Sequence, residues 1–152
     1  MASFKTVRFQ IDIEAPVSTV FRTMLDPGCY RQWASAFAEG TYYEGEWRQG
    51  GRLRFLAPSG DGMLSEVAEH RPDECTSIRH LGMIAGGAED TSSDMARAWA
   101  SARETYRFVA LPGGTRVEVE QDATEEFVAY LADAWPKALQ QLKALCEGGA
   151  AG

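Results

Sequence analysis

The sequence predicts an α+β fold, a curved antiparallel sheet of about seven strands wrapped around one long C-terminal helix. Two observations predict it. Short alternating segments separated by turn residues fill the middle of the chain, and the alternating segment 116–120 leads into an amphipathic stretch that reaches residue 146. Because a curved sheet closed by a helix encloses space, we expect a cavity between the two layers.

The N-terminal part predicts one strand followed by two short helices. Apolar and polar residues alternate strictly over 7–13, which is the period of a half-buried strand. Apolar residues then recur at helical spacing over 17–25, until Asp26-Pro27-Gly28 ends this helix. A second helical turn is expected through Tyr30 and Trp33. Two short helices at this place can close one end of a sheet.

Six further strands are expected, because short alternating segments are separated by turn residues such as Gly, Pro and Asp. They are Thr41–Trp47, Arg52–Leu56, Met63–His70, Cys75–Met83, Ala102–Ala110 and Thr115–Ala123. Their short, even spacing favours an antiparallel meander. Residues 85–100 are predicted instead to form a long loop that ends in a helical turn. Loops of this length often form lids, and Trp99 is the lid candidate.

The C-terminal stretch 125–146 predicts a single amphipathic helix about 33 Å long. Its apolar stripe consists of Phe127, Leu131, Trp135, Ala138, Leu142 and Leu145. A helix of this length can lie across the whole sheet and cover it.

Several short motifs carry a resemblance to a known family. They are Ile13-Glu14-Ala15-Pro16-Val17 with Val20-Phe21, Leu25-Asp26-Pro27 with Trp33, Glu46-Trp47, Gly50-Gly51, Glu104-Thr105-Tyr106, Gly113-Gly114-Thr115, and Trp135-Pro136-Lys137-Ala138-Leu139 with Leu142-Lys143. With the order of elements, they make the chain resemble the helix-grip fold of the SRPBCC or START-like superfamily, which includes birch-pollen-allergen-like proteins. Within it, the chain is similar to bacterial homologues of the heat-shock-protein-90 ATPase activator domain. The resemblance implies an apolar cavity between sheet and helix, and it assigns no activity, because these are motifs of the fold.

Length and charge exclude several classes of function. The 152 residues fit one domain, 1–152, and the net charge of -7 argues against nucleic acid as a partner. No apolar run approaches the roughly 20 residues of a membrane span, and the N-terminus lacks the layout of a secretory signal, so we expect a cytoplasmic protein. The three cysteines show no spacing typical of a disulfide framework or a zinc site. No metal and no cofactor are expected.

Candidate ligand-binding residues are the apolar and aromatic side chains expected to face the cavity. They are Trp47, Ile78, His80, Tyr106, Phe108, Leu131 and Trp135. Aromatic rings with a polar edge suit a pocket that holds an apolar molecule and orients it by a few hydrogen bonds. The same side chains would equally suit an ordinary close-packed core.

Three residues are candidates for acid–base chemistry: Glu104, Tyr106 and His80. Glu104 and Tyr106 share one strand face, and Gln121 faces the same way from the next strand. A buried carboxylate beside a tyrosine could remove a proton or polarise a carbonyl. We favour the alternatives, in which these groups lie in water at the sheet rim and His80 is a hydrogen-bonded structural residue. No catalytic residue is therefore assigned.

Three functions from different classes follow. The first is a non-enzymatic carrier or sensor that binds a small hydrophobic molecule, such as a lipid, between the sheet and the terminal helix. The second is an interaction module, either chaperone-associated, as the resemblance implies, or a homodimer through an open face. The third is a cyclase-type or hydratase-type enzyme that uses the same cavity, and the sequence favours a role without catalysis.

Overall fold

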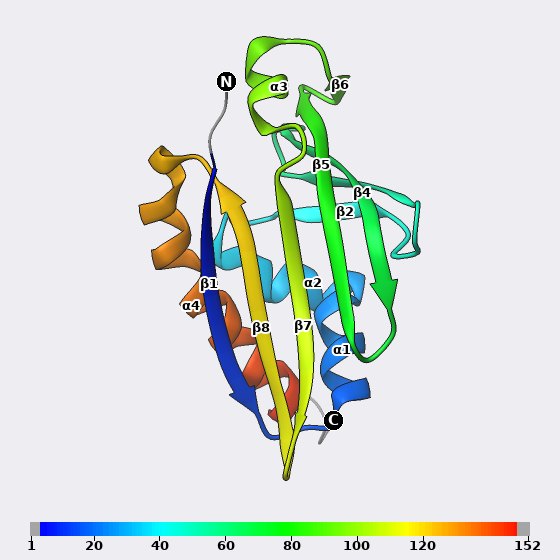
Figure 1. Ribbon diagram of the computed structural model, residues 1–152, viewed down its shortest axis with the longest axis vertical. Helices are drawn as coiled ribbons and strands as arrows, with labels where there is room; N and C mark the ends of the chain where they lie inside the picture. Colours follow the sequence, from blue (N-terminus) through cyan, green and yellow to red (C-terminus); the bar gives the residue numbers. More distant parts are fainter. Residues whose placement is uncertain (1–3, 149–152) are drawn as a thin grey trace.

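Eight strands form one antiparallel sheet in the computed structural model, which describes residues 4–148 (Figure 1). They are β1 (Lys5–Ile13), β2 (Tyr42–Gly45), β3 (Arg52–Leu56), β4 (Gly62–Arg71), β5 (Cys75–Ala85), β6 (Ala88–Asp90), β7 (Arg103–Leu111) and β8 (Gly114–Ala123). The order across the sheet is β1-β8-β7-β5-β4-β3-β2, and the short β6 pairs with β5. The predicted fold class is confirmed, with one strand more than expected.

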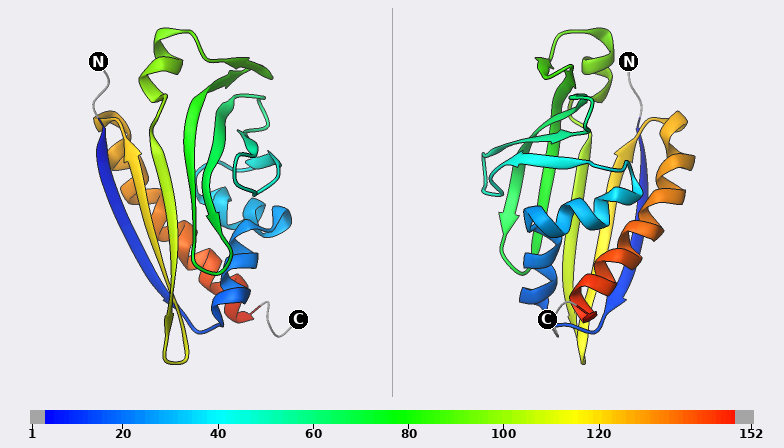
Figure 2. Two further views of the ribbon diagram at one scale, coloured as in Figure 1. Left: turned by 45° about the vertical axis from the view of Figure 1, so that its right-hand side comes forward. Right: turned by 180° about the vertical axis from the view of Figure 1, so that it is seen from behind.

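The helices of the described chain lie mainly on one face of this sheet (Figure 2). They are α1 (Val17–Leu25), α2 (Pro27–Trp33), the 3-10 turn η1 (Ala34–Ala36), α3 (Asp94–Trp99) and α4 (Glu125–Gly148). Asp26 separates α1 from α2, because its carboxylate caps α2 by accepting a hydrogen bond from the amide of Cys29 at 3.0 Å. Helix α4 packs on β1, α1 and α2 and thereby closes the layer over the sheet.

The segment 85–100 was predicted as a long loop that ends in a helical turn. The helical turn is confirmed as α3, whereas the first part of the segment forms a hairpin with β6 and is not a plain loop. Gly86 and Gly87 form the two-residue turn between β5 and β6. Their φ angles of 56° and 85° are both positive, as the common hairpin turn of this length requires. Ser93 then caps α3 by accepting a hydrogen bond from the amide of Ala96 at 3.1 Å. Helix α3 packs against β5, and its residue Ala96 is fully buried.

The buried apolar residues form three clusters. The largest lies between α4, α1, α2 and the strands β1, β7 and β8, and it contains Trp33, Tyr106 and Trp135. Two smaller clusters lie along β3, β4 and β5, one around Ile78 and the other around Ile84. One pocket lies where the three clusters meet, because it is lined by members of each: Trp33, Tyr106, Trp135, Ile78 and Ile84.

Candidate functional site

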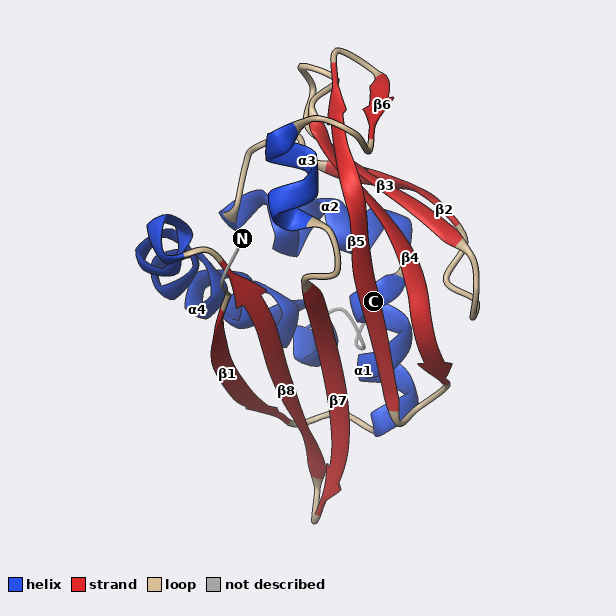
Figure 3. Cartoon of the chain, turned by 45° about the horizontal axis from the view of Figure 1, so that its top comes forward, coloured by secondary structure: helices blue, strands red, loops and turns tan. Residues whose placement is uncertain are grey.

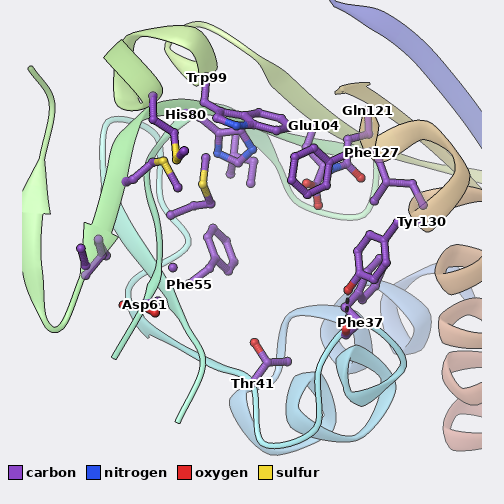
Figure 4. A pocket seen from close by; sticks show the side chains of 18 of the residues that line it. Phe37, Thr41, Phe55, Asp61, His80, Trp99, Glu104, Gln121, Phe127 and Tyr130 are labelled. Carbon is purple, nitrogen blue, oxygen red and sulfur yellow. Dashed lines mark hydrogen bonds between the residues drawn. The ribbon is translucent and has the colours of Figure 1, made fainter. Parts of the chain in front are cut away.

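A pocket of about 650 Å³ lies between the sheet, α2 and the first turns of α4 (Figure 4). Its volume is within the range of roughly 300–1,000 Å³ typical of small-molecule sites. Nine aromatic side chains line it: Tyr30, Trp33, Phe37, Phe55, Trp99, Tyr106, Phe127, Tyr130 and Trp135. The pocket can therefore surround an apolar molecule of moderate size with aromatic faces and edges.

Three large apolar side chains mark the side of the pocket that faces solvent. Met95 on α3 is 64% exposed, and Phe127 and Tyr130 on α4 are 41% and 45% exposed. Figure 3 looks toward this end of the molecule, where α3 lies near the start of α4. Trp99 and Phe127 connect the two helices by an edge-to-face contact with ring centroids 5.3 Å apart. The entrance is thus apolar and is partly covered by α3.

Polar side chains on three neighbouring strands form one wall of the pocket. Glu104 on β7 is directly opposite Gln121 on β8, and on its other side it is opposite Ile78 on β5. His80 lies two residues beyond Ile78 and lines the same pocket. The sheet register therefore places a carboxyl, an amide and an imidazole side by side, as Figure 4 shows.

Glu104 is half-buried, and its partner in this wall is a tyrosine. The hydroxyl of the buried Tyr106 donates a hydrogen bond to Oε2 of Glu104. Burial raises the pKa of Glu104 to about 7, while this hydrogen bond acts in the opposite direction. Burial and the charge of Glu104 also raise the pKa of Tyr106 well above its ordinary value. Near neutral pH the tyrosine stays protonated and Glu104 can exchange a proton.

Gln121 is held in one orientation by the indole of Trp135. The Nε1–H group donates to Oε1 of Gln121 at 2.6 Å. An indole nitrogen can only donate, so the atom that it contacts must be the amide oxygen. The amide nitrogen of Gln121 consequently remains as a donor for another partner.

His80 is 6% exposed, and its Nδ1 lies 2.7 Å from Oγ of Ser65. Burial lowers the pKa of His80 to about 4, so the imidazole is neutral at pH 7, although the charge of Asp122 acts in the opposite direction. Ser65 is fully buried, and among the described residues its hydroxyl has no other hydrogen-bond partner. We expect the hydroxyl to donate to Nδ1, because this direction satisfies the buried O–H group, and the ring proton then lies on Nε2.

Most of the residues expected at the site line this pocket. Of the predicted ligand-binding residues, Ile78, His80, Tyr106, Leu131 and Trp135 do so, as do the lid candidate Trp99 and the acid–base candidate Glu104. The favoured alternative of exposure at the sheet rim does not hold for Tyr106, which is 3% exposed. The alternative for His80, a hydrogen-bonded buried histidine, matches its contact with Ser65. Whether any of these residues binds a ligand stays a prediction.

Two expected lining residues lie outside the pocket. Phe108 faces the same side of β7 as Tyr106, but two residues further along it packs edge-on against Phe21 of α1, with ring centroids 5.0 Å apart. Trp47 was expected inside a strand, yet β2 ends at Gly45, whose φ of 112° breaks the alternation of faces. Trp47 instead lines a second hollow of about 430 Å³.

Sequence reasoning missed the lining residues that other elements bring to the pocket. They include Tyr30, Phe37, Phe55, Met63, Met83 and Met95. Phe127 was expected on the buried stripe of the terminal helix and lies at the entrance instead. The many aromatic residues between 30 and 55 are a sequence signal that could have indicated these lining residues. Which of them meet at the pocket depends on how β2 and β3 pack over α2.

Two further observations concern metals and membranes. Within residues 4–148, no three His, Cys, Asp or Glu side chains gather in a way that could hold a metal ion. None of the helices in that range combines the length and the apolar character needed to cross a membrane.

Comparisons with known proteins agree with the fold. The family model described as "Activator of Hsp90 ATPase homolog 1-like protein" matches residues 14–147. No curated protein matches the chain. Protein MLL2253 from Mesorhizobium loti superimposes with a TM-score of 0.73 at 17% identity, over 94% of this chain and 97% of that one.

Two other solved structures have related folds. The Aha1 dimer from Colwellia psychrerythraea gives a TM-score of 0.70 at 16% identity and covers 94% of this chain and 96% of that one. CalU16 from Micromonospora echinospora gives 0.67 at 18% identity and covers 95% and 76%. At these identities the likeness establishes the architecture alone.

Proposed function

The chain belongs to the family of activator of Hsp90 ATPase homolog 1-like proteins, and from this premise and the pocket we propose that it binds a small, largely apolar molecule, as a carrier or sensor. The observation that carries the proposal is the pocket of about 650 Å³ with its nine aromatic side chains. Protein interiors are normally close-packed, so an apolar space of this size calls for an occupant.

A largely aromatic lining with a polar wall on the sheet supports the same proposal. Aromatic side chains come from α2, α3, α4 and the sheet, whereas Glu104, His80 and Gln121 lie together on three strands. Such a lining holds the body of a ligand by burial and orients it by a few hydrogen bonds. We further propose that residues 1–152 act as a single domain.

Filling the pocket tests the proposal. Met83 is half-buried and lines the pocket, so Met83→Trp would place a ring in the space that a ligand needs. Val109 on β7 is 40% exposed and outside the pocket, so Val109→Trp is the matched control. A neutral polycyclic fluorophore should bind to wild type and to V109W, and M83W should weaken this binding at least about tenfold. Equal binding to both variants, with both melting like wild type, would refute the proposal.

A protein-interaction role is the second candidate. The exposed apolar side chains Met95, Phe127 and Tyr130 at the entrance favour it, because apolar groups gathered at one place on a surface often mark contact sites. The partner would be a second copy of the chain or a chaperone. Sedimentation of wild type and of Phe127→Glu checks the first case, and a monomer at all concentrations would exclude it. A cyclase-type or hydratase-type activity at Glu104, Tyr106 or His80 remains the third candidate.

A further inference from the structure

The acidic and basic side chains that line the pocket are all acidic. Its lining contains three acidic residues, Asp61, Asp90 and Glu104, and none of its described lining residues is a lysine or an arginine. His80 does not supply a positive charge, because burial lowers its pKa to about 4. An anionic ligand such as a fatty acid would therefore meet only like charges.

The two aspartates already have partners of their own. Asp61 accepts a hydrogen bond from the amide of Gly86 at 2.9 Å. Asp90 accepts from the amides of Ser92 and Ser93 at 3.1 and 3.0 Å. Both carboxylates thus stabilise the turns around the β5–β6 hairpin.

Glu104 differs because no cation faces it. The ion pairs among residues 4–148 do not include it, and its hydrogen bond from Tyr106 comes from a neutral group. The titratable groups around it are Tyr106 on β7, Tyr30 on α2, His80 on β5 and Tyr130 on α4, and each is neutral at pH 7. The neighbour on β8, Gln121, is uncharged. Removing a carboxylate from water without a counter-charge is unfavourable. A positive charge on a ligand would therefore stabilise the ionised form of Glu104.

We propose that the bound molecule carries a cationic amine on an apolar, aromatic-compatible body, and that this amine pairs with the Glu104 carboxylate. The inference rests on the proposed function, since it names the chemical class of ligand for that pocket. The charge–charge attraction is strong here because the surrounding side chains lower the local dielectric. Trp99 and Tyr30 also line the pocket, and aromatic rings attract cations, while Gln121 offers its amide N–H to an oxygen near the amine.

Three matched probes test this inference: anthracenylmethylamine, anthracenylmethanol and anthracenecarboxylate, each substituted on the central ring. They share one apolar body and differ in charge. Titrations followed by fluorescence at about pH 8, where Glu104 is mostly ionised, should rank the amine first and the carboxylate last. We expect the amine to bind at least about tenfold more tightly than the alcohol.

Two isosteric variants isolate the contribution of Glu104. Glu104→Gln removes the charge in the pocket, and Glu118→Gln removes one charge from β8 at a position between the buried Val117 and Val119, on the opposite face. E104Q should weaken the amine at least about tenfold and change the alcohol less than about threefold. E118Q controls for the altered net charge and should leave all three affinities near those of wild type.

Proton release gives a second readout. Because the pKa of Glu104 is about 7, pairing with an ammonium group should release about half a proton at pH 7, seen as a buffer-dependent binding enthalpy. The alcohol and the E104Q protein should release none. If the alcohol binds while the amine gains nothing over it, or if the carboxylate binds best, the amine inference is overturned and the proposed function stands. If none of the three probes binds to wild type, both are overturned.

Discussion

The hydroxyl of Tyr106 donates a hydrogen bond to the carboxylate of Glu104, two residues earlier on the same face of β7. This contact lies in the wall of the apolar pocket, where burial raises the pKa of Glu104. Because the donor is neutral, the contact satisfies one oxygen of Glu104 without balancing its charge. The properties of the pocket near neutral pH should therefore depend on this residue.

Glu104 should make stability depend on pH. Its pKa is raised from 4.5 to about 7 in the folded protein, so the protonated form is favoured by folding. The stability that it contributes is complete below about pH 4.5 and is lost as the pH rises through 7. For this half-buried group we expect a loss of about 1–3 kcal/mol. Urea denaturation of wild type and Glu104→Gln at pH 5 and pH 8 measures it, and a difference that is the same at both pH values would contradict the expectation.

Ser65 should fix the tautomer of His80. We expect the buried hydroxyl to donate to Nδ1, so nitrogen-detected NMR at pH 7 should show the imidazole proton on Nε2. Ser65→Ala should mix the tautomers and cost about 1–3 kcal/mol of unfolding free energy, because Nδ1 loses its partner. A proton found on Nδ1 of wild type would show that the hydroxyl accepts instead.

His80 should also limit stability in acid. Its pKa falls from 6.5 to about 4 on folding, because burial disfavours the charged ring. The stability that comes from keeping it neutral is present above about pH 6.5 and is lost as the pH falls toward 4. NMR titration of His80 should give a midpoint well below that of a free histidine, and a midpoint near 6.5 would rule out this assignment.

The indole N–H of Trp135 should matter apart from the ring. Trp135→Phe keeps most of the buried aromatic surface but removes the donor to Gln121, so we expect a loss of about 1–3 kcal/mol. Trp99→Phe is the control, because Trp99 is half-buried and no side-chain hydrogen bond of its indole is found within residues 4–148. Chemical denaturation should separate the two variants, and equal losses would mean that the N–H contributes little.

Trp99 should slow the release of a bound molecule. It contacts Phe127 across the entrance, with centroids 5.3 Å apart, so Trp99→Ala opens the contact between α3 and α4. Stopped-flow dissociation of a bound neutral fluorophore should become several-fold faster, about threefold or more, with a smaller effect on the association rate. Val109→Ala, at an exposed position, is the control. An unchanged dissociation rate for W99A would show that α3 does not act as a lid.

The alternation of residues along β7 and β8 predicts, from sequence alone, that Glu104, Tyr106 and Gln121 face one side of the sheet, and the structure confirms it. The amphipathic stretch after residue 124 likewise predicts α4. Both properties are local, because the period of apolar residues specifies an element and the side that it buries. They do not specify how far along a strand the pocket extends.

The tertiary structure decided which of these inward-facing residues meet. Phe108 shares a face with Tyr106 but packs under α1, and Trp47 leaves the pattern because Gly45 ends β2. The contact between Trp135 and Gln121 joins two elements, and the lack of a cation near Glu104 depends on every element around the pocket. The sequence by itself determined the elements and their buried faces, because periodicity acts over a few residues. Only the folded chain determined the pocket and its charge, because these arise from register, curvature and packing between distant segments.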